Sequence, residues 1–199
     1  MWEIVVATRN RGKIAEIAAI LEPTVRVLSL DDVGFAGDLE EAGSSFEENA
    51  VSKARVVADA TRLLTVADDS GLLVDALGGR PGVLSARYGG DNLTDADRVA
   101  LLLEELKGVP RAQRTAEFVC VIAVATPSRV RAVWSGRVYG VIACEPRGSH
   151  GFGYDPVFEY LPVRKTFAEM EPEEKNAVSH RGRAVRQLPR RLKELAEDG

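Results

Sequence analysis

Residues 64–71 have the sequence LTVADDSG, in which a short apolar and β-branched run meets two adjacent carboxylates. The run from Leu64 to Ala67 favours a strand, and the Ser-Gly pair that follows the aspartates favours a turn. We therefore expect the strand to end at Asp68 and Asp69. Ligands of α/β proteins bind at the carboxyl ends of strands, so the two aspartates are expected at the ligand-binding edge of a sheet.

Strand and helix patterns alternate on both sides of this stretch. In chain order they are a strand at 3–7, a helix at 11–22, a strand at 25–30, a helix at 46–61, the strand at 64–67, a helix at 94–107, and two strands at 115–126 and 130–142. Pro127 and Ser128 separate the last two strands, which we predict to pair as an antiparallel hairpin. This order predicts an α/β fold with a mixed central sheet and flanking helices.

Polar residues mark the expected helix ends. Candidate N-caps are Asn10, Ser45 and Thr94. A C-terminal helix at 173–196 is expected to break at Ser179 and at Pro189. Because no Pro-, Gly- or Ser-rich linker divides the chain, we predict a single domain over residues 1–199.

Composition limits the class of protein. Of 199 residues, 45% are hydrophobic and 28% are charged, which is the balance of a soluble globular protein. The net charge of −4 argues against a general binder of nucleic-acid backbones, which needs an excess of positive charge. Cys120 and Cys144 show no metal or redox spacing, so we predict small buried side chains in a reducing, cytoplasmic protein. We expect neither a signal peptide nor a membrane span.

Residues 8–13, TRNRGK, join the first strand to the first helix. The N-terminus of a helix attracts anions, Gly12 permits close approach of a phosphate, and Lys13 adds positive charge. The segment is not a P-loop, because Ala7 and Ile14 stand where that motif needs Gly and Ser or Thr. Two interpretations stay open, a phosphate site and an ordinary turn with a solvated lysine.

Acidic residues supply candidates for a metal site. Asp68 and Asp69 repel each other unless a cation or a proton intervenes, and carboxylate oxygens suit Mg²⁺. Glu41, in a loop before a helix, is placed to complete such a site. The alternative for Asp68 is a turn in which it caps backbone amides. From the residues alone, Lys53 is best interpreted as a solvated surface lysine.

A glycine-rich segment at 148–156, GSHGFGYDP, is a candidate base-binding loop. Its glycines allow sharp turns near a ligand, and Phe152 and Tyr154 offer flat faces for stacking. The alternative is a surface loop whose aromatic rings close the core. Further candidate donors to phosphate or carbonyl oxygens are Lys175, His180 and Arg181. For His180 the alternative is a hydrogen-bonded structural role.

Taken in order, these segments resemble the inosine triphosphate/xanthosine triphosphate pyrophosphatase family over nearly the whole chain. The matching motifs are Ala7-Thr8-Arg9-Asn10 with Gly12-Lys13 and Glu16, Glu40-Glu41 with Phe46, Glu48-Asn49-Ala50 and Lys53-Ala54, Asp68-Asp69-Ser70-Gly71-Leu72, Leu77-Gly78-Gly79 with Pro81-Gly82 and Ser85-Ala86-Arg87-Tyr88, Gly151-Phe152-Gly153-Tyr154-Asp155-Pro156, and Ser179-His180-Arg181. The presence of all of them in order makes the resemblance specific. One departure is His150, where the family usually carries a smaller residue.

The resemblance implies an elongated α/β fold with two lobes around a nucleotide cleft, usually a homodimer. It implies Mg²⁺-dependent hydrolysis of ITP, dITP and XTP to the monophosphate and pyrophosphate, which keeps deaminated purines out of nucleic acids. The implied site residues are Thr8, Arg9, Asn10, Arg11, Gly12, Lys13, Lys53 and Ser70 for the triphosphate, Glu41 and Asp69 for Mg²⁺, Asp69 helped by Asp68 for catalysis, and Phe152, Gly153, Tyr154, Asp155, Lys175, His180 and Arg181 for the base and sugar.

Two rival functions have distinguishing features. A related pyrophosphatase for modified pyrimidines or methylated nucleotides would carry a serine-, proline- and arginine-rich opening motif, which residues 8–13 are not. A nucleotide sensor without activity, or an RNA-binding module, is the rival from another class. Carboxylates at positions 41, 68 and 69 argue against a sensor, and the acidic net charge argues against RNA.

Overall fold

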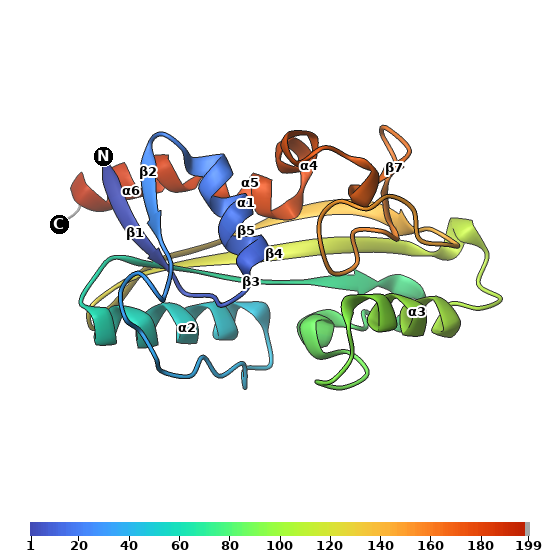
Figure 1. Cartoon of the computed structure of the whole chain (residues 1–199), viewed down its shortest axis with the longest axis horizontal. Coiled ribbons are helices and arrows are strands. Elements are labelled where there is room, and N and C mark those ends of the chain that lie inside the picture. The colour runs from blue at the N-terminus through green and yellow to red at the C-terminus, as the bar shows by residue number, and fades with distance from the viewer. Residues whose placement is uncertain (198–199) are drawn as a thin grey trace. The chain divides into compact units, whose positions relative to one another are not determined.

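A seven-stranded sheet runs through the computed structural model, which describes residues 1–197 (Figure 1). The strands are β1 (Trp2–Val6), β2 (Val25–Leu28), β3 (Thr65–Val74), β4 (Thr115–Thr126), β5 (Arg129–Ile142), β6 (Phe158–Tyr160) and β7 (Lys165–Thr166). Their order across the sheet is β2-β1-β3-β4-β5-β6-β7. β1 pairs in parallel with β2 and β3, whereas β6 pairs antiparallel with β5 and β7. The predicted mixed sheet is confirmed.

Two compact units can be distinguished, and each has its own apolar core. The first comprises residues 1–69, 120–136 and the C-terminal segment from residue 180, and the second comprises residues 70–119 and 137–179. β3, β4 and β5 contribute residues to both units, because the unit boundaries fall within these strands. Central residues of the first core are Ile4, Ile17, Ile122 and Leu188, and those of the second are Leu72, Leu102, Phe158 and Phe167.

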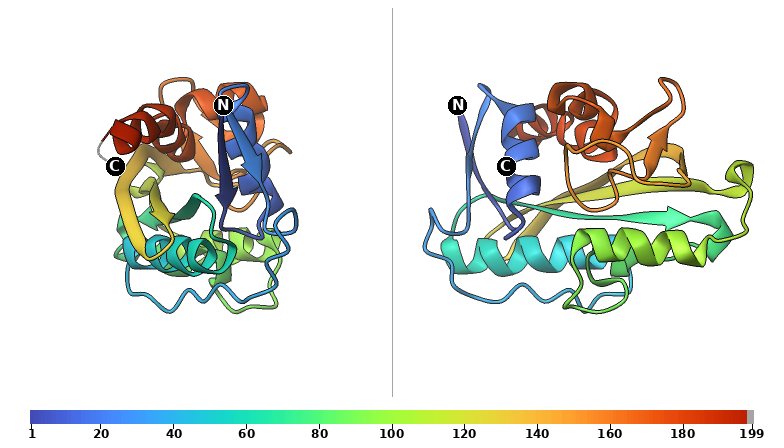
Figure 2. Two further views of the ribbon diagram at one scale, coloured as in Figure 1. Left: turned by 90° about the vertical axis from the view of Figure 1, so that its left-hand side faces the viewer. Right: turned by 45° about the vertical axis from the view of Figure 1, so that its right-hand side comes forward.

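Helices flank the strands of each unit (Figures 1 and 2). They are α1 (Arg11–Leu21), α2 (Phe46–Thr61), α3 (Asp95–Glu105), α4 (Pro172–Val178), α5 (His180–Val185) and α6 (Leu188–Glu197), with 3₁₀-helices at Asp75–Leu77, Gly82–Arg87, Arg111–Gln113 and Phe167–Glu169. In the first unit α2 lies on one face of the strands, and α1, α5 and α6 lie on the other. In the second unit α3 and α4 lie on opposite faces. The predicted α/β class is therefore confirmed.

Local hydrogen bonds start the helices where the sequence predicted. The side chains of Asn10 and Ser45 accept from the backbone N–H groups of Lys13 and Glu48, and Thr94 forms a reciprocal capping box with Asp97. The carboxylate of Glu48 accepts from Ser44 and not from Ser45, so α2 has the cap without the reciprocal box. β4 and β5 are sheet neighbours joined by two residues, which only an antiparallel hairpin permits.

The prediction that a strand ends at the two aspartates is wrong. β3 continues through Asp68, Asp69 and Gly71 to Val74, and only residues 75–77 turn into a 3₁₀-helix. A strand can retain polar residues at its centre when each side chain finds partners on the face toward which it points. Both aspartates do so, as described below, and the polar pair therefore lies inside the sheet.

Two further predictions concern the C-terminal half. The break at Ser179 is confirmed. The second break lies at residues 186–187, just before the position predicted, because Pro189 stands in the first turn of α6, where its missing N–H has no intrahelical partner to lose. Cys120 is buried as predicted, whereas Cys144 is exposed beyond the end of β5. Among the helices that the structure describes, none combines the length and the apolar character required to cross a lipid bilayer.

The core of the second unit provides a stability prediction. Leu102 of α3 is fully buried, so we expect Leu102→Ala to lower the free energy of unfolding by about 2–5 kcal/mol through lost contacts and a cavity. Urea unfolding followed by circular dichroism measures this loss. Leu84→Ala is the matched control, because Leu84 is 46% exposed and should change stability by less than about 0.5 kcal/mol. Equal losses in both variants would contradict the assigned core.

Candidate functional site

Asp68 and Asp69 at the centre of β3 point to opposite faces of the strand, because side chains alternate along a strand. Both are buried, with exposed fractions of 0% and 5%. The two faces surround them with different partners. The consequence is two separate clusters, an Asp68 cluster and an Asp69 cluster, both within the first unit.

The Asp68 cluster surrounds one carboxylate with three donors. Lys13 Nζ of α1 lies 2.5 Å from Oδ1, and Arg181 Nε of α5 donates to Oδ2 at 2.8 Å. The thiol of Cys120 on β4 donates to Oδ2 at 3.0 Å. Arg181 is itself 2% exposed, and its Nη1 lies 2.5 Å from Glu16 Oε2. Asp68 therefore ties α1, α5 and β4 to β3.

These contacts fix the charge state of Asp68. Burial alone would raise its pKa, but the positive charges of Arg181 and Lys13 hold the pKa of Asp68 well below its ordinary value. Burial, and then the negative charge of Asp68, raise the pKa of the Cys120 thiol well above its usual range, so the thiol stays a donor. The Asp68 cluster is thus a charged, fully hydrogen-bonded support and not a proton acceptor at neutral pH.

The Asp69 cluster contains a second carboxylate and a buried ammonium. Lys53 Nζ of α2 lies 2.7 Å from Asp69 Oδ1 and 2.7 Å from Glu41 Oε1. Lys53 is 4% exposed, so the interpretation of a solvated surface lysine is wrong. Its stem lies along a helix face of small residues, and its charge is buried because two carboxylates share it. The structure therefore brings together three of the residues that the resemblance implied.

One positive charge does not balance two carboxylates equally. Burial raises the pKa of Asp69, and the negative charge of Glu41 adds to the rise against the opposing effect of Lys53. Burial also acts to raise the pKa of Glu41, but the charges of Lys53 and Lys13 together lower that pKa. Adjacent residues Asp68 and Asp69 thus have pKa values displaced in opposite directions, which is the pattern of a divided acid–base role.

The residues around Asp69 fit a divalent cation of the hard, oxygen-preferring kind. Mg²⁺ binds through one or two carboxylates and completes its shell with water and substrate phosphates. Glu41 and Asp69 supply two such carboxylates around one point, and the Glu41 side chain is 31% exposed. Over residues 1–197, no group of three or more His, Cys, Asp or Glu side chains is arranged to hold a metal. A cation at this site would therefore need further oxygens from its ligand.

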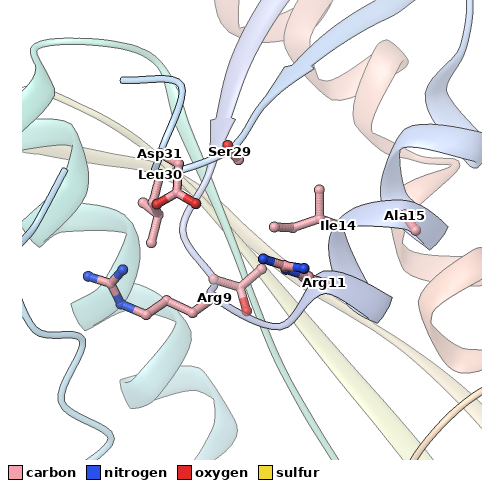
Figure 3. A pocket seen from close by; sticks show the side chains of 8 residues that line it. Arg9, Arg11, Ile14, Ala15, Ser29, Leu30 and Asp31 are labelled. Atoms are coloured by element: carbon pink, nitrogen blue, oxygen red, sulfur yellow. The ribbon is translucent and has the colours of Figure 1, made fainter. Parts of the chain in front are cut away.

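The loop before α1 carries an open, positively charged pocket of about 420 Å³ (Figure 3). Its lining residues are Thr8, Arg9, Arg11, Ile14, Ala15, Ser29, Leu30 and Asp31. Figure 3 shows Arg9 and Arg11 extending from the loop, with Ser29 and Asp31 beyond them. Asn10 does not line this pocket, because its side chain caps α1. Arg9 also donates from Nη2 to the carbonyl oxygen of Gly37 at 2.8 Å. Cationic side chains along one pocket suit an anion, and contact with phosphates stays a prediction for these residues.

The second unit holds the glycine-rich loop at residues 148–156. Asp155, 2% exposed, accepts from the backbone N–H of Phe152 at 2.8 Å and forms a buried ion pair with Lys175. The Lys175 ammonium lies 4.9 Å from the centre of the half-buried Phe152 ring. Gly151 has a φ of +75°, and a side chain there would overlap the Asp155 carboxylate. A buried ion pair therefore helps to hold the loop, which is not a loose surface segment.

The other members of this loop have mainly structural contacts. Tyr154 is 4% exposed, belongs to the apolar core and donates from its hydroxyl to Ser85 O at 3.0 Å. Of the two aromatic rings, Phe152 is therefore the one with a partly open face. The backbone N–H of Gly153 donates to Asp95 of α3 at 2.7 Å. The Nδ1 atom of His150 lies 2.9 Å from the carbonyl oxygen of Met170.

Three remaining residues are placed as follows. Ser70, half-buried, follows Asp69 on β3. Gly12 lies in the first turn of α1, and His180 is the buried first residue of α5, 4% exposed. The structure places each of them near the segments described above, and their ligand contacts stay predictions.

Comparison with known proteins identifies the family. The sequence matches the Ham1 family over residues 4–191. This chain belongs to the Ham1 family. The dITP/XTP pyrophosphatase of Geobacillus kaustophilus is 54% identical over 197 residues, covering 98% of this chain and 96% of the relative. That of Geobacter sulfurreducens is 53% identical over 186 residues, covering 93% and 94% of the two chains.

A solved Ham1 structure agrees with this assignment. The structure of a HAM1 protein from Coxiella burnetii superposes with a TM-score of 0.86 at 44% identity, covering 98% of this chain and 100% of the other. The resemblance drawn from the motifs is confirmed by these matches.

Asn49 is a site residue of this Ham1 chain that the sequence did not single out. Asn49 is 1% exposed, and its amide donates to Asp69 Oδ2 at 3.3 Å while accepting from the backbone N–H of Gly43 at 2.8 Å. It stands one helical turn before Lys53, so both side chains project from one face of α2 toward Asp69. That i, i+4 spacing, within a matched motif, was the available signal. Glu16 and Cys120 were missed as partners in the Asp68 cluster.

The Asp68 cluster leads to a prediction about stability and pH. Asp68→Asn leaves the buried Arg181 and the partly buried Lys13 with less compensating charge, so we expect a loss of about 3–5 kcal/mol in the free energy of unfolding at neutral pH. Because the folded-state pKa of Asp68 lies below its ordinary value of 3.8, its stabilisation is complete above that pH and is lost as pH falls through the folded-state pKa. The difference between wild type and variant should therefore shrink in acid.

Urea unfolding at about pH 7 and at about pH 3 measures both effects. Asp38→Asn is the control, because Asp38 is exposed and the variant removes the same charge. A loss that is equal at both pH values would show that the charge of Asp68 is not the source of the stabilisation.

Proposed function

We propose that this chain hydrolyses deaminated purine nucleoside triphosphates, such as ITP, dITP and XTP, to the monophosphate and pyrophosphate, and so keeps them out of nucleic acids. The observation that carries the proposal is the pair of adjacent buried carboxylates Asp68 and Asp69, with pKa values displaced in opposite directions. It occurs in a Ham1-family chain that is 54% identical to a protein named dITP/XTP pyrophosphatase. Asp68 stays ionised and positions neighbouring cations, while Asp69 has the raised pKa of a proton acceptor; such a division of roles suits a hydrolase.

Mg²⁺ is the proposed cofactor, held by Glu41 and Asp69. When bound, the metal would neutralise negative charge on the phosphate oxygens and so favour attack at phosphorus. The cations of this chain serve the same end. We assign the triphosphate to Arg9, Arg11 and Lys13 near α1, with Lys53, Ser70 and the backbone at Thr8, Asn10 and Gly12. Cationic side chains arranged around the triphosphate would stabilise the transition state by positioning the phosphates and neutralising their negative charge.

Asp69 is the proposed base. Its raised pKa makes the buried carboxylate a better proton acceptor than a solvated aspartate. In the proposed step the water oxygen bonds to the α-phosphorus, the bond from that phosphorus to the bridging oxygen breaks, and a proton of the water passes to Asp69. Pyrophosphate leaves with the bridging oxygen. Asp68 stays ionised and holds Lys13 and Arg181 in place.

Selection of the base is assigned to Phe152, Gly153, Tyr154 and Asp155 with Lys175, His180 and Arg181. The 6-keto oxygen of inosine and xanthosine accepts hydrogen bonds, whereas adenine presents an amino donor. Donors in a buried site would leave adenine unpaired, which discriminates strongly. Two nitrogens of Arg181 already donate to Asp68 and Glu16, so His180 and the loop amides are the alternative donors. Rejection of guanine requires a penalty against its 2-amino group.

Pyrophosphate release from ITP, dITP, XTP, ATP and GTP, with and without Mg²⁺, tests the proposal. We expect rapid Mg²⁺-dependent release from the first three and little from ATP and GTP. Equal rates on all five nucleotides would support the proposed hydrolysis but contradict the proposed selectivity for deaminated purines. Orthophosphate as the sole product would place the cleavage at another bond. Nucleotide binding without any release would favour the sensor.

Asp69→Asn tests the base separately. The amide keeps the shape of the side chain but cannot accept the proton of the attacking water, so we expect kcat to fall by about 10²-fold or more. Asp91→Asn, at an exposed aspartate, is the control and should retain wild-type kcat. Circular dichroism and urea unfolding check that the variant is folded. Wild-type turnover in a folded Asp69→Asn protein would remove Asp69 from this role.

Two properties accompany the proposal. A homodimer follows from the family resemblance, and a cytoplasmic location follows from the absence of disulfide spacing in the sequence. Both stay predictions.

A further inference from the structure

The Glu41–Asp69 pair already has a cation in the protein itself. Lys53 reaches it from the middle of α2, and its Nζ lies 2.7 Å from an oxygen of each carboxylate. An amine placed between two carboxylates at these distances forms two ion pairs as an ammonium. The pair that suits a divalent metal is therefore occupied by a positive charge.

A second cation on the same two oxygens would stand beside this ammonium. Like charges at such a distance repel strongly in a buried setting, where water screens them little. Lys53 and its side chain are 4% exposed, so the ammonium cannot be hydrated in place. It must leave the carboxylates before a metal can take both of them. The oxygens of an anionic ligand would offer the ammonium other negative partners.

Asp69 has two partners from α2 that differ in freedom of movement, the long side chain of Lys53 and the short side chain of Asn49. Lys53 holds Oδ1 at the end of a flexible four-carbon stem. Asn49, one helical turn earlier, holds Oδ2 through a short side chain that also accepts from the backbone N–H of Gly43. Gly43 lies two residues after Glu41, so Asn49 keeps both Asp69 and the Glu41 loop in place when Lys53 moves.

We propose that the Glu41–Asp69 pair holds one cation at a time, Lys53 in the free protein and a divalent metal once a triphosphate has drawn Lys53 away, so that metal and triphosphate enter together. This inference rests on the proposed function and adds an order of events to it. The ligand that the site recognises is then the metal–triphosphate complex and not the free metal. By linkage, triphosphate must strengthen metal binding by the same factor by which metal strengthens triphosphate binding.

Titration of the free protein with Mn²⁺, followed by the electron paramagnetic resonance signal of unbound Mn²⁺, tests the exclusion without turnover. We expect weak binding by wild type and binding about ten-fold tighter, or more, by Lys53→Met, which keeps an unbranched apolar stem but removes the competing charge. Lys53→Arg should bind as weakly as wild type, because the positive charge is kept. Lys107→Met is the control for net charge, since its ammonium lies at the surface beside Glu104.

Equal or weaker Mn²⁺ binding by folded Lys53→Met would overturn the inference. If metal-dependent pyrophosphate release by wild type were intact in that case, the proposed function would stand and only the exclusion would fall. Absence of Mn²⁺ binding in every form, with nucleotide or without, would remove the metal site and the inference together.

A measurement on the wild-type protein covers the case in which Lys53→Met does not fold. ¹⁵N spectra of the lysine ammonium groups report where Lys53 lies. Mg²⁺ alone should leave the Lys53 signal unchanged, and Mg²⁺ with α,β-methylene-ITP, which cannot be cleaved at that bond, should shift it. A shift of the same size with Mg²⁺ alone would overturn the inference.

Discussion

Two adjacent carboxylates buried in the middle of a strand are the constraint on which the rest of the first unit depends. A buried carboxylate is tolerated only when opposite charges and hydrogen-bond donors surround it. Asp68 receives donors from α1, α5 and β4, whereas Asp69 receives them from α2 on the other face. A slip of one residue in β3 would exchange the two faces, so these contacts fix the register of the strand as well as the helices around it.

The Asp68 and Asp69 clusters differ in the number of cations per carboxylate. This difference suits the Asp68 cluster to structural support and the Asp69 cluster to the proposed reaction. Asp68 faces two cations, Lys13 and Arg181, of which Arg181 also pairs with Glu16, and these charges keep Asp68 ionised. Asp69 shares one ammonium with Glu41, and its pKa rises because the carboxyl is buried, with a smaller contribution from the negative charge of Glu41. A site that is short of positive charge in the free protein is suited to gain it from a cation that arrives with an anionic ligand.

The second unit also contains a buried carboxylate, Asp155, which is stabilised by a buried cation and a hydrogen-bond donor. Asp155 and Lys175 form a buried ion pair, and the carboxylate also accepts from the backbone of the loop that it organises. Gly151 is required there because any side chain would collide with that carboxylate. Phe152 is left with a partly open ring beside the Lys175 ammonium. The loop is therefore held by an ion pair, by the lack of a Cβ at Gly151 and by hydrogen bonds to residues outside it, and not by regular secondary structure.

The sequence by itself determined the features that depend on near neighbours and on motif identity. These were the alternation of strands and helices, the N-caps of α1, α2 and α3, the β4–β5 hairpin and the family. A cap bond spans three residues, so local letters are enough to predict it. Tertiary structure alone decided that β3 runs through its aspartates, that Lys53 is buried, and that Asn49 and Cys120 support the site. Their partners lie 16, 20 and 52 residues away, and only packing brings such residues into contact.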